Sequence, residues 1–322
     1  MATRITTYSA LRASSSMARV PVFRLRSTVL IFASALSAAL SGCRAADAPR
    51  VATAAADPVD DFGNRIAITK PPARIVSLNP TTTEILFAIG AGGRLVGRSQ
   101  YDTFPDSAKT VPSLGPALRP SVEAIVAAKP DLVILYASED NRPAFDRLRQ
   151  AGIPTVGFKL DSIDHFRRDT RLLGRITGDS ARAVAVVDSV SATLERVRRA
   201  TANLPRPTVF IPTWEKPIIA IGGGSFLSEL VEIAGSTNIY ASIPTPSATV
   251  TIEDIVARNP DFVLAGRDRE RPIRALANWR AIPAVRDNHI LAFDFDLISR
   301  PSVQLGAAAV AIATLLHPGS VR

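Results

Sequence analysis

Two stretches of this chain, 130 residues apart, repeat one motif. The first reads PSVEAIVAAKPDLVIL (Pro120–Leu135) and the second VTIEDIVARNPDFVLA (Val250–Ala265), and they are identical at seven of sixteen positions. Each copy has a helix-forming segment, a Pro-Asp pair and then an apolar run of strand length. A chain of 322 residues is long enough for two domains. The repeat therefore predicts two similar halves, each with a glutamate, Glu123 or Glu253, at the same place.

Short strands alternate with helices in both halves, which is typical of an α/β domain with a mostly parallel sheet. We expect strands at Arg74–Leu78, Leu95–Arg98, Asp131–Tyr136, Thr155–Phe158, Thr208–Ile211, Ile218–Ile221, Asp261–Ala265 and Ile290–Phe293. We expect a helix that starts near Glu84 and is capped by residues 81–83. We also expect a helix that starts at Ser225, and a closing helix over Pro301–Leu316.

A longer helix separates the halves. Apolar residues recur at three- and four-residue steps through Ser180–Asn203, at Val184, Val187, Val190, Leu194 and Val197. At 1.5 Å per residue this helix is about 36 Å long. We therefore expect two Rossmann-like α/β lobes bridged by a single long helix. The expected boundaries are a signal peptide (1–42), a flexible tether (43–62), an N-terminal lobe (63–178), the bridging helix (179–204) and a C-terminal lobe (205–318).

The first 42 residues have the composition of an export signal. They carry five arginines, no acidic residue and an apolar run, Val29–Leu40, that is too short for a permanent membrane span. Leu40-Ser-Gly-Cys43 resembles the lipobox of bacterial lipoproteins, which implies that Cys43 is diacylated and begins the mature protein. A plain secretory signal is the alternative. Translation would start at Met1 or Met17. Cys43 is the only cysteine, so no intrachain disulfide can form.

Charge and motifs exclude several classes of function. The formal charge of +9 falls to +4, with 33 basic and 29 acidic residues, once the five leader arginines are removed, so we expect no nucleic-acid binding. The histidines, His165, His289 and His317, lack metal-ligand spacing, and no P-loop or nucleophile-elbow motif occurs. We therefore expect no catalytic residues, no protein-held metal and no cofactor.

Several motifs resemble one family. RIVSLNPTTTEILFAIGAGGRLVG (Arg74–Gly97), the two repeated segments and Ser299-Arg300-Pro301 are similar to the periplasmic substrate-binding proteins of ABC importers for vitamin B12, ferric siderophores and haem. Among these, the cobalamin-binding members are most similar. The resemblance covers about 60–318 and implies the helical-backbone fold of two lobes joined by a rigid helix.

The resemblance also gives the repeated glutamates a role. It implies that Glu123 and Glu253 each dock against arginines of one subunit of a two-fold symmetric permease dimer. Carboxylate–guanidinium pairs fix orientation well. Alternatively, both glutamates simply lie near helix N-termini, where a negative charge is favoured. The two interpretations are compatible.

The candidate ligand residues follow predicted strands, because ligands bind beyond the carboxyl ends of strands in open α/β sheets. By the resemblance, Tyr101 and Tyr136 match positions where the cobalamin binders present aromatic side chains, and Trp214 lies close to another such position. Aromatic rings suit a flat macrocycle. Each could instead be buried packing. The loop 113–116 lacks a tryptophan that cobalamin binders carry. The remaining candidates are Asn79, Phe295 and Arg300.

Arg300 has two interpretations. It either pairs with a carboxylate or phosphate of the ligand, or bridges to Asp294 or Asp296. We expect a monomeric periplasmic lipoprotein, held at a membrane by its lipid, that captures cobalamin or another metal chelate between its lobes. It would deliver this cargo to an ABC permease with its ATPase subunits. A ferric siderophore or haem is the alternative cargo.

Overall fold

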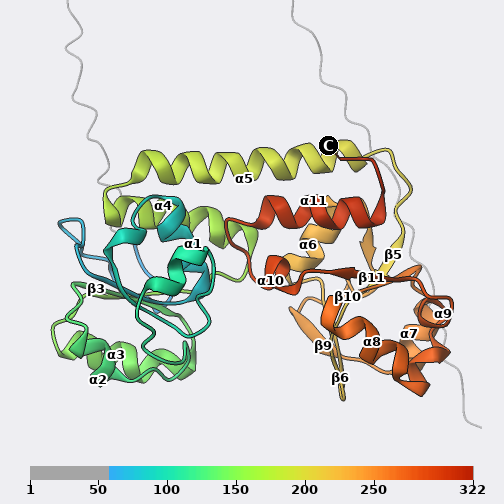
Figure 1. The fold of residues 1–322 in the computed structure, drawn as a ribbon, viewed down its shortest axis with the longest axis horizontal. Helices are drawn as coiled ribbons and strands as arrows, with labels where there is room; N and C mark the ends of the chain where they lie inside the picture. The colour runs from blue at the N-terminus through green and yellow to red at the C-terminus, as the bar shows by residue number, and fades with distance from the viewer. Residues whose placement is uncertain (1–57, 322) are drawn as a thin grey trace, which may run out of the picture. The chain divides into compact units, whose positions relative to one another are not determined.

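The computed structural model describes residues 58–321. The expected leader (1–42), Cys43 and residues 44–57 of the expected tether lie outside the described residues. Figure 1 shows a parallel sheet with helices in each half of the described chain, and helix α5 (Ser180–Thr201) between the halves in sequence.

The first lobe is built on a four-stranded parallel sheet in the order β2-β1-β3-β4. Its strands are β1 (Ile75–Leu78), β2 (Leu95–Arg98), β3 (Leu132–Tyr136) and β4 (Thr155–Phe158). Its helices are α1 (Pro80–Ala88), α2 (Val122–Ala127), α3 (Arg142–Gln150) and α4 (Ile163–Thr177), with 3₁₀ turns at Gly92–Arg94, Asp106–Thr110 and Glu139–Asn141. Strands β1 and β3 are apolar and buried almost throughout, as a sheet covered on both faces requires.

The second lobe repeats this sheet and adds a smaller one. Its parallel sheet has the order β11-β10-β5-β8, and an antiparallel sheet has the order β6-β7-β9. The strands are β5 (Thr208–Phe210), β6 (Pro212–Glu215), β7 (Ile218–Ile221), β8 (Thr237–Asn238), β9 (Ser247–Thr249), β10 (Phe262–Gly266) and β11 (Ile290–Phe293). The helices are α6 (Phe226–Ile233), α7 (Ile252–Arg258), α8 (Arg267–Ala275), α9 (Pro283–Arg286), α10 (Phe295–Ile298) and α11 (Leu305–Leu316), with a 3₁₀ turn at Ala277–Ala281.

The two parallel sheets share one pairing scheme. Strand β1 lies between β2 and β3, and β3 also pairs with β4; in the second lobe β5 lies between β8 and β10, and β10 also pairs with β11. Each repeated sequence motif supplies a helix and the strand after it, α2–β3 in one lobe and α7–β10 in the other. The sequence repeat is therefore a repeat of topology, which confirms the predicted fold class.

Both motif helices begin with the same cap. The Ser121 hydroxyl accepts a hydrogen bond from the backbone N–H of Ala124 at 3.1 Å, and the Thr251 hydroxyl accepts one from the N–H of Asp254 at 3.2 Å. Such caps satisfy a backbone donor that the helix cannot pair internally. They place the next residue but one, a glutamate in each case, in the first turn.

The turn after each motif helix is repeated as well. Lys129 and Asn259 have left-handed φ values of 48° and 44°, a conformation that ends a helix. Two residues later, the Asp131 carboxylate accepts hydrogen bonds at 2.8 Å from the two N–H groups preceding β1. The Asp261 carboxylate accepts one at 2.7 Å from the first N–H of β5. The repeated spacing of the motif thus joins each helix to the central strands of its sheet.

Helix α5 packs on α4 of the first lobe and on α11 and α6 of the second (Figure 1). Its buried side is formed by Ala183, Val187, Val190, Leu194, Val197 and Thr201. Val184, which we placed on the apolar side, is exposed, because the buried positions follow the three- and four-residue steps from Ala183. One core cluster continues from the first lobe through α5 into α6 and α11 of the second. A helix packed on both lobes in this way should restrict how far they tilt.

Three further details differ from the sequence-based expectations. Helix α1 begins at Pro80 and not near Glu84, because the Asn79 side chain caps it and proline suits the first helical position. Residues 212–215, expected to be a loop, form strand β6. Residues 58–62 of the expected tether contact the first lobe: the Phe62 ring lies 4.5 Å from that of Phe145. Within the described residues, no helix has the length and apolarity needed to cross a bilayer.

Candidate functional site

A cavity of about 630 Å³ is lined by both lobes. The first lobe contributes Leu78, Asn79, Pro80, Thr81, Ala117, Leu118, Tyr136, Leu160 and Asp161; the second contributes Ser225, Phe226, Pro246, Ser299, Arg300 and Pro301. Apolar side chains and proline rings alternate with a small number of polar groups. This composition is typical of sites for small organic molecules.

The parallel sheet explains why the first-lobe residues converge. In the sheet register, Leu78 of β1 pairs with Leu135 of β3, and Tyr136 pairs with Phe158 of β4. The three strands therefore end at one edge, and the residues at or after their ends line the cavity together. This is the location at which open α/β sheets bind ligands.

Asn79 is held in the cavity wall by its capping role. Its side-chain oxygen accepts a hydrogen bond from the N–H of Thr81 at 3.1 Å, which fixes the orientation of the amide. The Nδ2 donor is buried and has no hydrogen-bond partner among the described residues. An unpaired buried donor costs about 1–3 kcal/mol, so a ligand acceptor that reached it would be favoured.

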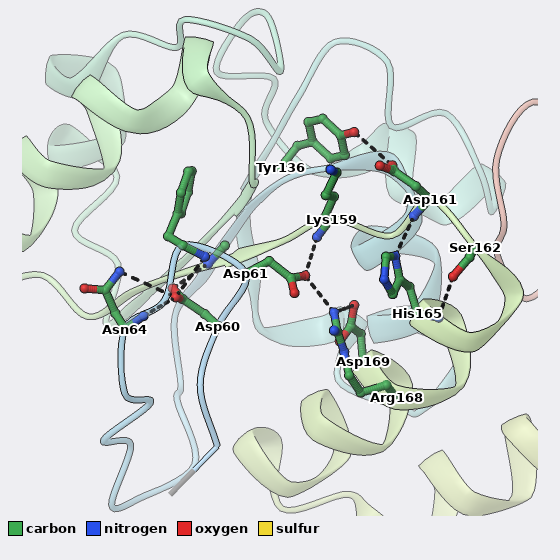
Figure 2. A network of polar contacts seen from close by, with 12 residues as sticks. Asp60, Asp61, Asn64, Tyr136, Lys159, Asp161, Ser162, His165, Arg168 and Asp169 are labelled. Atoms are coloured by element: carbon green, nitrogen blue, oxygen red, sulfur yellow. Dashed lines mark hydrogen bonds and ion pairs between the residues drawn. The ribbon is translucent and has the colours of Figure 1, made fainter. Parts of the chain in front are cut away.

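Tyr136 is fixed by Asp161, as Figure 2 shows. The tyrosine hydroxyl donates to the Asp161 carboxylate at 2.8 Å, and burial together with this contact raises the pKa of Tyr136 far above its ordinary value. The backbone N–H of Asp161 faces Nδ1 of His165 at 3.4 Å. The phenol therefore stays protonated and presents its ring in a set orientation.

The segment that carries Asp161 is held by a second set of contacts (Figure 2). The Asp61 carboxylate accepts from the N–H of Lys159 and from Arg168, each at 2.7 Å. Arg168 also binds the fully buried Asp169. Burial raises the pKa of Asp169, although the adjacent guanidinium acts in the opposite direction. The amino-terminal segment and α4 thus fix the loop between β4 and α4 that supplies the cavity wall.

Arg300 joins the two lobes. Its Nε donates to Oε1 of Glu84 at 2.5 Å, and Gln304 Nε2 donates to the other carboxylate oxygen at 3.4 Å. Glu84 belongs to α1 of the first lobe and is only 1% exposed, whereas the Arg300 side chain is 19% exposed. The partner of Arg300 in the structure is therefore neither Asp294 nor Asp296, because Glu84 needs a cation to offset the loss of its hydration.

The structure brings three of the six candidate ligand residues together: Asn79, Tyr136 and Arg300. Tyr101, Trp214 and Phe295 are at least half exposed and are not among the lining residues. Trp214 lies in strand β6, where Arg269 is 5.6 Å from its ring centroid. A ligand contact by these three side chains stays a prediction.

Leu118, Leu160 and Phe226 line the cavity although the sequence did not single them out. Aliphatic side chains have no chemical signature that separates a ligand wall from a core. Phe226 follows a recognisable helix cap, since the Ser225 hydroxyl accepts from the N–H of Leu227 at 3.2 Å. Its position one residue after that cap was the only local feature of the sequence that could have indicated a place in the cavity wall.

The loop that carries Tyr101 is organised by the buried Asp102. Its carboxylate accepts hydrogen bonds from the hydroxyls of Ser99 and Thr83, and the N–H of Tyr101 donates to Ser99 Oγ at 3.2 Å. Burial raises the pKa of Asp102, although these hydrogen bonds act in the opposite direction. The carboxylate form is therefore penalised in the folded protein.

We expect the substitution Asp102→Asn to change how stability depends on pH. A pKa raised by folding gives a stabilising contribution that is complete below the unfolded pKa and is lost as the pH rises through the folded pKa. An amide avoids this loss and can still bond to both hydroxyls. The variant's free energy of unfolding, relative to wild type, should therefore increase in urea titrations as the pH rises from below the pKa of an unfolded aspartate to above the raised pKa of folded Asp102.

Asp106→Asn is the matched control, because Asp106 is fully exposed and a hydrogen bond from Lys109 lowers its pKa. Its stability difference from wild type should change in the opposite direction or not measurably. A pH-independent difference for Asp102→Asn would show that the buried carboxylate is not penalised.

The repeated glutamates lie on the surface. Glu123 and Glu253 are exposed in the first turns of α2 and α7, which lie on the sides of their lobes away from α5 (Figure 1). Hydrogen bonds from its own backbone N–H and from the capping hydroxyl of Ser121 lower the pKa of Glu123, and the equivalent groups with Thr251 lower that of Glu253. Both carboxylates are ionised and accessible, one on each lobe.

The described residues contain no group of three or more histidine, cysteine or carboxylate side chains placed to hold a metal ion. His165 faces Asp161, His289 lies 5.6 Å from the ring of Phe262, and His317 contacts the carbonyl of Gly235 at 3.1 Å. The three histidines therefore have separate surroundings.

Comparisons with known proteins agree with this architecture. Residues 75–297 match the model of a family described as periplasmic binding protein. A vitamin B12-binding protein of Vibrio parahaemolyticus is 25% identical over 242 residues, which cover 75% of this chain and 88% of that protein. The crystal structure of the periplasmic vitamin B12 binding protein BtuF of Vibrio cholerae has a TM-score of 0.67 at 25% identity, covering 76% of this chain and 97% of BtuF.

The same fold occurs in a protein with other cargo. The periplasmic heme-binding protein RhuT from Roseiflexus sp. RS-1 has a TM-score of 0.67 at 24% identity, covering 75% of this chain and 98% of RhuT. At this identity the likeness concerns the fold alone.

Proposed function

We propose a specific cargo for this chain, which belongs to the periplasmic binding protein family and is a substrate-binding protein of an ABC transporter. The cargo is a corrinoid of the vitamin B12 type, captured in the cavity between the lobes and delivered to a membrane permease. The observation that carries the proposal is the cavity itself, in which Tyr136, Phe226 and Leu118 meet from both lobes.

The chemistry of a corrinoid matches this wall. A corrin ring offers two flat, largely apolar faces and a rim of amide groups, and its cobalt is already chelated. Aromatic and aliphatic side chains can cover the faces. The amide donor of Asn79 is buried and unpaired, and it would bind a rim carbonyl once ligand binding exposes it. No metal ligand from the protein is needed.

Delivery would use the two surface glutamates. A permease dimer with two-fold symmetry requires one docking group on each lobe, and Glu123 and Glu253 occupy the same place in two repeated substructures. Arginines of the permease would form bidentate pairs with them. ATP hydrolysis by separate subunits would then open the lobes against the restraint of α5, while a lipid on Cys43 of the monomeric protein holds it at the membrane.

Visible absorption spectra of the purified protein test the cargo. Cyanocobalamin, haemin and a ferric tris-catecholate are each added and the unbound chelate is removed. We expect retention of cyanocobalamin alone, at one molecule per chain and with a Kd of about 1 μM or below. Retention of haemin or the catecholate in place of cyanocobalamin would assign the chain to the alternative cargo.

A pair of substitutions tests the location of the site. Tyr136→Ala should weaken cyanocobalamin binding about tenfold, because it removes an aromatic surface from the cavity wall. Tyr136→Phe, which keeps the ring, should have a smaller effect. Trp214→Ala is the control, since this exposed ring does not line the cavity. The opposite ranking in calorimetric titrations would move the site to the exposed aromatic residues.

A further inference from the structure

The cavity wall carries few charges, and its one cation is already paired. Among the described residues that line the cavity, Arg300 is the only basic side chain and Asp161 the only acidic one. Arg300 donates to Glu84 at 2.5 Å and to the Ser299 hydroxyl at 3.1 Å. Its guanidinium is therefore directed at a carboxylate of the opposite lobe.

Glu84 holds this pairing in place. The carboxylate is 1% exposed, and a buried carboxylate without a cation would be strongly unfavourable. The second oxygen of Glu84 accepts a hydrogen bond from Gln304 at 3.4 Å. An anionic ligand that claimed the guanidinium would leave Glu84 buried and uncompensated.

Two arginines near the cavity are also paired, and Lys159, which precedes the lining residues Leu160 and Asp161, is exposed and does not itself line the cavity. Arg119, next to the lining residue Leu118, donates to Asp140 at 2.7 Å. Arg168, which organises the loop bearing Asp161, is shared between two carboxylates. With Glu84 and Arg300 offsetting each other, Asp161 leaves the lining residues with one net negative charge.

We propose that the cavity selects cargo without net negative charge, and that the Glu84–Arg300 pair determines this specificity. The inference rests on the proposed function, in that it takes the cavity as the cargo site. A negatively charged chelate would lose its hydration and lie near Asp161, and no lining residue would offer it an unpaired cation. Amide-rimmed corrinoids and neutral or cationic ferric hydroxamates satisfy the requirement; haem carboxylates and ferric tris-catecholates do not.

Ligands that differ in one charge test this specificity on the wild-type protein. Cyanocobalamin is compared with the three monocarboxylates obtained by hydrolysing one propionamide at a time, which changes the charge with almost no change of shape. Calorimetry should show at least one monocarboxylate bound about tenfold more weakly, and none more tightly, because a carboxylate facing the wall has no cation to pair with. Equal affinities for all four, or tighter binding of a carboxylate, would overturn the proposal.

The variant Glu84→Gln tests the role of the ion pair. It leaves Arg300 without its counter-charge. The Kd of the monocarboxylate that wild type binds weakly, divided by the Kd of cyanocobalamin, should therefore fall about tenfold. The ratio is measured within one protein, so a partial loss of folded protein does not affect it. Glu215→Gln is the matched control, because Glu215 pairs with Arg269 in the same lobe but neither residue lines the cavity. An unchanged ratio in Glu84→Gln would remove the pair from the explanation.

Two further probes separate this inference from the corrinoid assignment. If cyanocobalamin does not bind but the cationic ferric chelate ferrioxamine B does, the cargo assignment fails and the charge rule stands. If cyanocobalamin does not bind and haemin or a ferric tris-catecholate does, both fail. If cyanocobalamin binds as tightly as all its monocarboxylates, only the charge rule fails.

Discussion

Replacing both Glu123 and Glu253 by alanine should reduce corrinoid uptake by cells about a hundredfold or more, while the affinity of the purified protein for cyanocobalamin stays unchanged. In the proposed docking, each substitution removes one of two charged contacts with the permease, and truncating one partner of such a pair costs about 2–5 kcal/mol at an interface. Both side chains are exposed in helices that supply no residue to the cavity wall. The measurement is uptake of labelled cyanocobalamin in cells whose only copy of the gene encodes the variant.

The control for this experiment is the double variant Glu195→Ala/Glu232→Ala. Both of these glutamates belong to helices α5 and α6, outside the repeated motif, and uptake should be normal. Each single variant, Glu123→Ala or Glu253→Ala, should show an intermediate loss, since one docking contact remains. Normal uptake in the double motif variant, or a parallel loss of ligand affinity, would contradict docking through these carboxylates.

Removal of the inter-lobe cation should produce the largest loss of stability. Arg300→Met leaves Glu84 buried without a guanidinium and should lower the free energy of unfolding by about 3 kcal/mol. Arg269→Met provides the comparison, because its partner Glu215 is 20% exposed and can be hydrated when the pair is broken. We expect a loss of about 1 kcal/mol there. Urea denaturation monitored by circular dichroism gives both values.

The double variant Glu84→Leu/Arg300→Met separates the ion pair from packing. Replacing both charged groups by apolar ones removes the uncompensated carboxylate, so much of the lost stability should return. If the double variant is as unstable as Arg300→Met, then the loss comes from the packing of the methionine and not from an unpaired Glu84.

The architecture was readable from the sequence because its signals are local or repeated. The 130-residue repeat predicted two similar lobes, and both copies form the same cap, left-handed turn and aspartate contact. The long amphipathic pattern predicted a helix over 180–203, which the structure places at Ser180–Thr201. The apolar residues of such a pattern form one face of the helix, and that face is buried in the fold.

Helix α4 and strand β6 are absent from the sequence-based expectations, for different reasons. Helix α4 follows the cap residue Ser162 and ends at Gly178, whose left-handed φ of 79° closes it, and both residue types are common helix boundaries. The sequence analysis placed Trp214 in a loop after the strand expected at Thr208–Ile211, whereas it lies in strand β6. This strand pairs with β7 in a small antiparallel sheet, and such edge pairing depends on a neighbour that local sequence does not specify.

The candidate site was only partly predictable for a related reason. Residues after strands could be placed at the sheet edge, and Asn79 and Tyr136 do line the cavity. Tyr101, Trp214 and Phe295 were also chosen because they follow predicted strands, but they do not line the cavity. Position along a strand does not determine where an aromatic ring points. The partner of Arg300 is 216 residues earlier in the chain, and no periodicity or spacing connects the two.

A crystal structure of the protein grown with cyanocobalamin would test the central claim most directly. The account predicts one corrinoid between the lobes, with Tyr136, Leu118 and Phe226 against its ring faces and Asn79 within hydrogen-bonding distance of a rim amide. A corrinoid bound on the outer surface of either lobe, or a cavity that stays free of corrinoid at saturating concentration, would contradict it.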